Sequence, residues 1–400
     1  MKHILMATTA LVATAGIASA DVSLSGWAEM GMVGGNGGET EFHQDIDVSF
    51  SMSGETDGGL SFSAGVDLDE WPGAGTPNDD GGVAINISGG FGSLTMGDTD
   101  GALDWALTEG GNVKNGGSIA DNETGHAGYR GSYLDGNEDG QILRYDNTIG
   151  SMGIAASIEM DDNGNTALSS AAAAASAAGT LTVRNTFVPN AAGTVATAAA
   201  TATVATVGNV AALTESGDSS MALGVKYNMD LAGGNLAMGL GYQTAADRVS
   251  YVSAATDNAA NAILTSTVSV ADTSAVGFSA TYAASSGFSI GVALTEYDDF
   301  VGVNARASVA GEAGHGAAGA AIAGYLSDAS HLSIGVGFTT GPVTLHANYG
   351  ELDYDAVAIA DVDGYGVSIA YDLGGGAKVK LGMNDNAAGD DFSFGLAMSF

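Results

Sequence analysis

Residues 42–52 read FHQDIDVSFSM and alternate apolar with polar side chains almost without error. One parity carries Phe42, Ile46, Val48, Phe50 and Met52. The other parity carries His43, Asp45, Asp47, Ser49 and Ser51. Successive side chains of a β-strand point to opposite faces, so this period of two predicts a strand with one apolar face and one polar face.

The same alternation recurs in sixteen segments along the chain. They begin near Val22, Thr40, Leu60, Gly82, Ser93, Gln141, Gly153, Ser219, Asn235, Thr273, Phe288, His331, Val343, Gly364, Lys378 and Asp391. Short glycine-rich connections, such as residues 54–59 and 374–377, follow every second segment, and longer polar connections lie between them. An even strand number with short turns on one side and long loops on the other is typical of transmembrane barrels. We therefore predict an all-β fold, a closed antiparallel barrel with short periplasmic turns and long extracellular loops.

Two alternatives to this fold stay open. Residues 301–326, VGVNARASVAGEAGHGAAGAAIAGYL, could supply two further strands and make an eighteen-stranded barrel. A soluble β-sandwich also alternates, but its exposed face carries many charges, whereas the polar faces here are rich in Ser, Gly, Asn and Thr. Aromatic residues on the apolar parity near the short turns favour the membrane barrel, because they would form an interfacial girdle. They are Phe50, Phe62, Tyr227, Phe288, Phe338 and Tyr371.

The composition restricts the class of protein further. The 400 residues include 62 glycines, 4 prolines and no cysteine, and no run of eighteen apolar residues offers a transmembrane helix. The formal net charge of −36 excludes nucleic acid as a partner and is expected to attract cations. Because hydrolase, phosphate-loop and dinucleotide motifs are absent in a supporting context, we predict that the chain is not an enzyme.

Residues 1–20 have the features of a cleavable signal peptide. Lys2 and His3 precede an apolar stretch that ends at Ala18-Ser19-Ala20, a small-x-small cleavage signature. An uncleaved N-terminal anchor is the alternative. We expect residues 21–400 to form the exported barrel domain, located in the outer membrane.

Three segments resemble one known family. They are DVSLSGWAEMGM at residues 21–32, GGFGSLTMGD at residues 89–98, and the last thirty-six residues, which start at YGVSIAYDLG. These segments resemble the general porins of Gram-negative outer membranes, in the alphaproteobacterial branch that includes the trimeric porins of purple photosynthetic bacteria. The resemblance implies a homotrimer in which each subunit forms a water-filled pore for passive diffusion of small hydrophilic solutes. It does not extend to residues 161–218, an Ala/Thr-rich insertion that we expect outside the membrane.

The resemblance also implies that the third long loop, residues 98–140, folds into the pore. A solvated external lid is the alternative for such an acidic loop. On the loop side, the expected constriction residues are Asp98, Asp100, Asp104, Glu109, Asp121 and Glu123. On the wall side, the expected pore-lining residues are Glu29, His43, Asp45, Asp47, Asp67, Arg144, Lys226, Lys378 and Lys380, all on the polar parity of their strands. A charge on the lipid face would cost about 2–4 kcal/mol at the bilayer midplane, which supports this parity.

Acidic residues outnumber basic ones among these candidates, so we predict a weakly cation-preferring pore. Its partners would be outer-membrane lipid, lipopolysaccharide, small solutes and cations. No cofactor is expected to be required, although Ca²⁺ could bind at acidic loops through Asp79-Asp80, Asp298-Asp299 or Asp390-Asp391. A secreted acidic adhesin or surface-layer protein is the functional alternative from another class.

Overall fold

The computed structural model of the chain describes residues 21–35, 38–69, 83–136, 141–160, 219–258, 261–307, 321–356, 359–386 and 389–400. The predicted signal peptide, residues 1–20, and the predicted insertion, residues 161–218, lie outside these ranges, as do Asp79 and Asp80. Within the described ranges, no helix is both long and apolar enough to cross a membrane.

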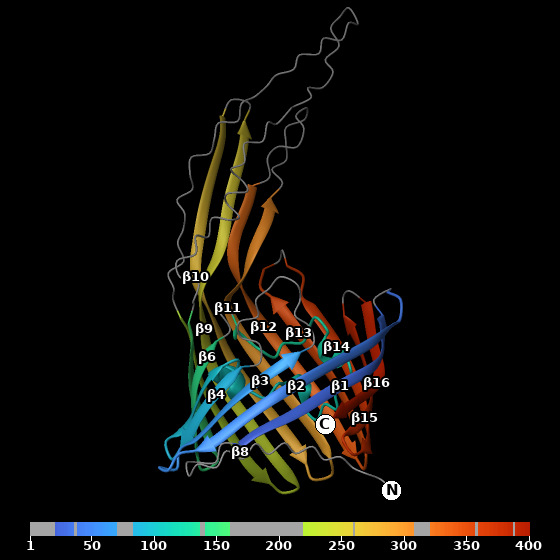
Figure 1. Ribbon diagram of the computed structural model, residues 1–400. Coiled ribbons are helices and arrows are strands. Elements are labelled where there is room, and N and C mark those ends of the chain that lie inside the picture. Colours follow the sequence, from blue (N-terminus) through green and yellow to red (C-terminus); the bar gives the residue numbers. More distant parts are fainter. Residues whose placement is uncertain are drawn as a thin grey trace, which may run out of the picture.

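Sixteen antiparallel strands form one closed barrel (Figure 1). The strands are β1 Asp21–Gly35, β2 Glu41–Glu55, β3 Ser61–Asp69, β4 Ala84–Gly89, β5 Gly92–Gly97, β6 Ile142–Ile149, β7 Met152–Glu159, β8 Ser220–Leu231, β9 Gly234–Asn258, β10 Asn261–Ala284, β11 Phe288–Ala307, β12 Ala321–Thr340, β13 Val343–Tyr354, β14 Val362–Gly374, β15 Ala377–Asn386 and β16 Gly389–Ser399. Each strand pairs with its neighbours in sequence, and β1 pairs with β16, with Trp27 opposite Ser399. This last pairing closes the sheet and satisfies backbone groups that lipid could not solvate. The predicted sixteen-stranded all-β barrel is confirmed.

The alternation of residues 42–52 orients β2 as predicted. Phe42 is 91% exposed and Ile46 is 51% exposed on the outer face, whereas His43 and Asp45 on the inner face are half-buried. All six aromatic residues of the predicted girdle are exposed, by 36–46%. An outer surface of this kind suits hydrocarbon and not water.

The long strands β9 to β12 correct one part of the prediction. β10 begins at Asn261 and β12 at Ala321, well before the predicted starts at Thr273 and His331. Residues 301–307 and 321–327 do not form two extra strands; they pair with each other and prolong β11 and β12 after a register shift between Tyr297 and Val301. The barrel therefore has sixteen strands and not eighteen. Small alternating residues such as those at 301–326 extend a hairpin as readily as they start a new one, so sequence alone left both arrangements open.

Candidate functional site

The third long loop lies inside the barrel. It contains three short helices, α1 Ala102–Ala106, η1 Gly110–Asn112 and η2 Asn122–Thr124. Helix α1 contacts β7, β8 and β9, η1 contacts β10 to β13, and η2 contacts β14, β15 and β16. The loop thus follows the inner wall from β7 round to β16, and the inner faces of β2 to β5 lie across the lumen from it. We call residues 98–136 the constriction loop and the space between it and β2 to β5 the channel.

Glycines on the inner wall let the constriction loop approach the strands closely. A Cβ atom on Gly366 would lie 2.0 Å from the backbone oxygen of Glu123, and one on Gly239 would lie 2.1 Å from that of Ala106. The same crowding against the loop occurs at the other members of this glycine belt. The belt comprises Gly31, Gly224, Gly239, Gly241, Gly277, Gly291, Gly335, Gly337, Gly350, Gly364, Gly366, Gly382 and Gly395. Sequence reasoning missed the belt, although its signal was present as glycine on the polar parity of successive strands.

Hydroxyl groups of the wall also fix the loop. The Oγ atom of Ser157 accepts a hydrogen bond from the backbone N–H of Ala102 at 2.8 Å, at the start of α1. The Oγ atom of Ser279 accepts one from the N–H of Thr108 at 2.8 Å. The bond to Ala102 satisfies a backbone donor that a short helix leaves free at its N-terminal end, and the bond to Thr108 holds the segment that follows α1.

An apolar cluster inside the barrel packs the loop against β11 and β13. Leu103 and Leu134 of the loop are fully buried together with Tyr297 and Leu352 of the wall. The guanidinium carbon of Arg130 lies 4.8 Å from the ring centroid of Phe300, a cation–π contact. Arg130 is therefore stacked on the wall and is not a free positive charge in the channel.

The predicted loop residues fall into two groups. Asp98, Asp100 and Asp121 are exposed, and Asp104 and Glu109 are half-buried. Glu123, in contrast, is 1% exposed and accepts a hydrogen bond from Nδ2 of Asn115 at 2.7 Å. Its side chain lies beneath the loop, so we remove Glu123 from the channel-facing set.

Burial and mutual repulsion change the acidity of the loop carboxyls. Burial, together with the nearby carboxyls of Asp100, Asp135 and Glu109, raises the pKa of Asp104 to about 8. Burial also raises the pKa of Asp135 to about 6. Hydrogen bonds from the N–H of Gly101 at 2.7 Å and from Nε2 of Gln243 at 2.6 Å favour the charged carboxylate and limit this rise. Near neutral pH the loop therefore carries less negative charge than its sequence indicates.

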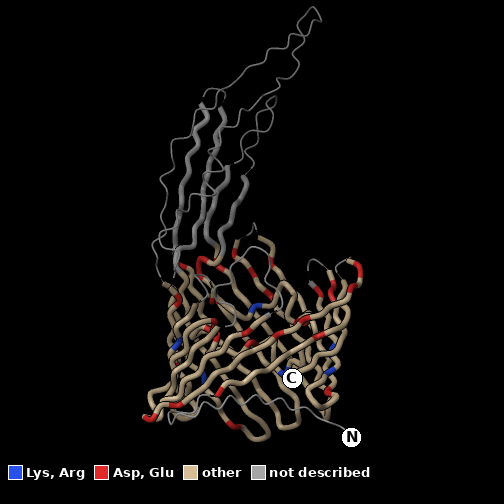
Figure 2. The backbone as a smooth tube through the Cα atoms, viewed as in Figure 1, with Lys and Arg blue, Asp and Glu red and all other residues tan. Residues whose placement is uncertain are grey.

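The wall opposite the loop is acidic. On β2, His43, Asp45 and Asp47 are half-buried, and on β3 Asp67 is exposed and accepts a hydrogen bond from Oγ of Ser49 at 2.8 Å. Asp and Glu outnumber Lys and Arg over the barrel as a whole (Figure 2). The channel thus has carboxyl groups on both of its sides.

Glu29 and Lys380 meet behind the loop. Nζ of Lys380 lies 3.1 Å from Oε1 of Glu29, and the two side chains are 9% and 8% exposed. The same ammonium lies 3.4 Å from the backbone oxygen of Ser118 and 4.8 Å from the ring centroid of Trp27. The pair joins β1, β15 and the loop, and neither charge faces the channel. The parity of both residues was predicted correctly, but parity cannot distinguish the channel from the space under a loop.

Arg144 holds the beginning of the loop. Its Nη1 atom donates to the backbone oxygen of Asp100 at 2.5 Å and to Oγ1 of Thr99 at 3.2 Å. Its Nε atom lies 3.4 Å from Oδ1 of Asp146. Arg144 therefore has a structural role in addition to its place at the wall of the lumen.

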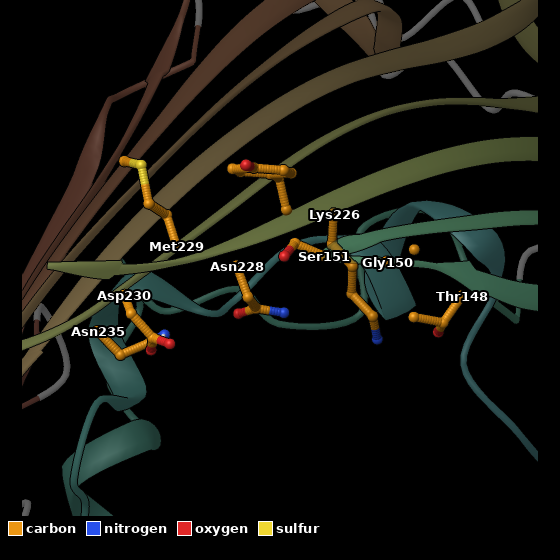
Figure 3. A pocket seen from close by; sticks show the side chains of 10 residues that line it. Thr148, Gly150, Ser151, Lys226, Asn228, Met229, Asp230 and Asn235 are labelled. Atoms are coloured by element: carbon orange, nitrogen blue, oxygen red, sulfur yellow. The ribbon is translucent and has the colours of Figure 1, made fainter.

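Lys226 and Lys378 line cavities near the short turns. Lys226 borders a cavity of about 360 Å³, and its Nζ lies 3.5 Å from the ring centroid of Trp105. Figure 3 shows Lys226 and Asp230 projecting from β8 to one side and Met229 to the other, as the alternation requires. Lys378 is exposed and borders a second cavity of about 260 Å³ together with Lys114.

The acidic pair Asp298-Asp299 is hydrogen-bonded to the neighbouring strands β10 and β12. Oγ of Ser274 donates to Asp298 at 3.4 Å, and the N–H of Asp299 donates to Asp328 at 2.9 Å. Among the described residues, no group of three or more His, Cys, Asp or Glu side chains is placed to hold a metal ion. Ca²⁺ at the acidic loops stays a prediction from the sequence.

The proteins and family model that this chain resembles are porins. The family model described as Gram-negative porin matches residues 7–391. A porin of Rhodobacter capsulatus is 43% identical over 82 residues, which are 20% of this chain and 26% of that protein, so the match spans about a quarter of the relative's length.

Solved structures show the same fold at low identity. A porin refined at 1.8 Å is 21% identical with a TM-score of 0.58, and the match covers 95% of this chain and 100% of that one. A triple mutant of the Rhodopseudomonas blastica porin is 15% identical with a TM-score of 0.51 and the same coverage. A loop-deletion mutant of OmpT, an outer membrane protein of Vibrio cholerae, is 12% identical with a TM-score of 0.53, covering 95% and 99% of the two chains.

Proposed function

The chain belongs to the Gram-negative porin family, and on this premise we propose that it is an outer-membrane porin through which small hydrophilic solutes and ions diffuse passively. One observation carries the proposal: the closed barrel has an apolar outer face, and a fixed loop narrows its polar lumen. The family consists of channels, not enzymes. We propose that the barrel needs no cofactor for this activity. The adhesin interpretation receives no support from the family match. Outer-membrane lipid and lipopolysaccharide would surround the barrel, and cleavage of residues 1–20 would precede its insertion.

Liposome swelling tests the proposed diffusion directly. Vesicles that contain the purified mature protein are diluted into isotonic solutions of uncharged sugars of increasing mass. Swelling should be rapid for the smallest sugars and fall steadily with sugar size, because the constriction loop narrows an open lumen. Heat-unfolded protein in the same vesicles is the control. Folded protein that gives no swelling with the smallest sugar would count against a diffusion pore.

We also propose a homotrimer with the outer face of β4 and β5 inside the subunit contact. These strands have six residues each, whereas about 9–11 residues are needed for a strand to span the hydrocarbon core. Their outer side chains Ile85, Ile87, Leu94 and Met96 are nonetheless 38–48% exposed. A low, apolar part of the wall is better covered by a second copy of the chain than by lipid.

Substitution on this face should weaken the trimer selectively. Ile87→Asn puts an amide into the proposed contact and should shift cross-linked protein in mild detergent from three chains to one. Leu223→Asn on the outer face of β8, where Leu223 is 62% exposed, is the matched control and should leave the trimer intact. Equal cross-linking patterns for the two variants would place the contact elsewhere on the barrel.

The charges of the channel support a weak preference for cations. Asp67 and the half-buried Asp45 and Asp47 lie on one side, and the loop carboxyls lie on the other. The positive groups are mostly engaged: Lys380 pairs with Glu29, and Arg130 stacks on Phe300. A lumen with this balance raises the local concentration of cations and lowers that of anions.

This preference should increase between pH 7 and pH 9. The pKa of Asp104, raised to about 8, means that this carboxyl loses its proton in that range and adds one negative charge beside the channel. A unit charge about 8 Å from an ion changes its free energy by about 0.5 kcal/mol in water, so the permeability ratio should rise roughly twofold. Reversal potentials under a KCl gradient give this ratio.

Asp104→Asn should remove the increase. Glu296→Gln alters an exposed carboxyl on the outer face of β11 and serves as the control with the same change of charge. A rise of equal size in the Asp104→Asn protein would show that another group titrates in this range.

A further inference from the structure

Three histidines and an asparagine lie buried between the constriction loop and the wall. His126 belongs to the loop, His331 to β12, and His346 and Asn348 to β13. They are 3%, 2%, 2% and 6% exposed, respectively. None of them faces the channel.

The hydrogen bonds of Asn348 fix the proton position on His126. Nδ2 of Asn348 donates to the backbone oxygens of Gly111 at 2.9 Å and Glu123 at 2.8 Å, so the other amide atom is the oxygen. That oxygen accepts the N–H of Gly366 at 2.8 Å and lies 2.9 Å from Nε2 of His126. An oxygen can only accept, so Nε2 of His126 carries the hydrogen and Nδ1 is bare.

The other two histidines are fixed in the same way. Nδ1 of His346 lies 2.9 Å from the backbone oxygen of Val113 and must donate to it. Nε2 of His346 lies 3.3 Å from Nδ2 of Asn348, a donor group that cannot accept a hydrogen, so Nε2 is bare. Nε2 of His331 lies 3.0 Å from the backbone oxygen of Gly128 and must donate to it. All three rings are thus neutral donors that hold the loop, directly or through Asn348.

A second proton on any of these rings would have no acceptor. Nδ1 of His126 and Nδ1 of His331 are buried and make no hydrogen bond within the described protein. Nε2 of His346 faces an amide donor, so a hydrogen there would point at another hydrogen. Burying an ionised donor without an acceptor is strongly unfavourable.

We propose that His126, His331, His346 and Asn348 form a latch that positions the constriction loop against the wall, and that protonation of the histidines releases the loop toward the channel. This inference rests on the proposed porin function and adds a pH-dependent positioning role to it. At neutral pH the latch keeps the channel open. In acid the freed loop narrows it.

Charged groups on several elements face the latch. Asp363 on β14 favours protonation of His126, and Glu123 of the loop faces His346. Arg130 of the loop and His126 face His331. Tyr129 meets the ring of His126 edge-on at 6.0 Å between centroids. Burial outweighs Asp363 and the Asn348 hydrogen bond and lowers the pKa of His126 below its ordinary value of 6.5.

The sign of the pH effect follows from this lowered pKa. The released loop exposes His126 to water, where it binds a proton near pH 6.5, whereas the latched loop binds it only at lower pH. The latched state is therefore fully stable above about pH 6.5 and loses stability as the pH falls below that value.

Single-channel recording at pH 7.5 and pH 5 tests the latch. The natural protein should show closures whose frequency rises by up to roughly tenfold per pH unit below about 6.5 for each proton taken up. A variant carrying His126→Gln, His331→Gln and His346→Asn retains an N–H donor at each ring position but cannot titrate. It should conduct normally at pH 7.5 and show no additional closures at pH 5.

A tethered loop separates latch release from titration of channel carboxyls. Oγ of Ser368 donates to Oδ1 of Asn115 at 2.6 Å, so Asn115→Cys with Ser368→Cys can join the loop to β14, and the chain has no other cysteine. The oxidised pair should abolish acid closures, and reduction should restore them. Acid closures that persist in the histidine variant or in the oxidised tether would overturn the proposal.

Amide hydrogen exchange keeps the test independent of conduction. After correction for intrinsic rates, residues 113–128 should exchange faster at pH 5 than at pH 7.5 in the natural protein and equally at both in the histidine variant. Equal protection in the natural protein at both pH values would refute the latch. A folded barrel that never conducts at pH 7.5 would refute the porin proposal and leave this exchange measurement to judge the latch.

Discussion

Lys380→Met is expected to lower the free energy of unfolding by about 3–5 kcal/mol, the usual cost of leaving one member of a buried ion pair without its partner. Nζ of Lys380 lies 3.1 Å from Oε1 of Glu29, and neither side chain is more than 9% exposed. The pair lies beside the β1–β16 seam that closes the barrel and beneath the constriction loop. Loss of the ammonium leaves a buried carboxylate at this seam. Urea titration of the detergent-folded protein, followed by tryptophan fluorescence and heat-modified gel mobility, measures the change.

The double variant is the decisive control for this prediction. Glu29→Gln alone should also destabilise the barrel, because it leaves the buried ammonium of Lys380 without its counter-charge. Lys380→Met combined with Glu29→Gln removes both charges, and its cost should be well below the sum of the two single costs. Additive costs would mean that the two side chains do not interact as the 3.1 Å contact indicates.

Gly366→Ala is expected to displace the constriction loop and lower the channel conductance. The new methyl group would lie 2.0 Å from the backbone oxygen of Glu123, a contact that requires the loop to move. The loop lies between this wall and the channel, so the only free direction is toward the channel. Overpacking of this kind costs about 1–3 kcal/mol in stability, which the barrel can tolerate. Single-channel conductance at pH 7.5 is the measurement.

Gly65→Ala provides the matched control. Gly65 lies on the inner face of β3, where no loop covers the wall, and the nearest atom to an added Cβ is 3.9 Å away. Its conductance should equal that of the natural protein. If Gly366→Ala also left the conductance unchanged while the barrel stayed folded, the loop would not be seated on the glycine belt.

The fold was predictable from the alternation of apolar and polar residues within single strands. Residues 42–52 alternate because one face of β2 meets lipid and the other meets the lumen, and this pattern is visible in any single strand. Short turns after every second strand then fixed the antiparallel order. Strand length was not predictable in the same way, since the small residues at 301–326 neither require nor exclude a continued hairpin.

For the candidate site, the sequence predicts which strand residues face the inside of the barrel, because apolar and polar residues alternate, but it does not predict which of them face the channel. The polar parity of Lys380 and Glu29 placed both inside the barrel, but only the loop's path shows that they lie beneath it. Glu123 was assigned to the channel because it lies in an acidic loop, yet its backbone turns the side chain toward Asn115 and the wall. The glycine belt and the histidine latch depend on contacts between residues far apart in the chain, such as Gly111 and Asn348, which are 237 positions apart. A local pattern can mark the glycines on the inner face, but it does not identify their partners in the loop.

An open channel with carboxyl groups on both of its sides should conduct ions and prefer cations. Planar-bilayer recording of the purified mature protein, with the reversal potential taken under a KCl gradient at pH 7.5, measures both properties. We expect large, nearly ohmic steps that occur in threes and a reversal potential of the sign that marks cation preference. Folded protein without conductance, or a reversal potential of the opposite sign, would contradict this expectation.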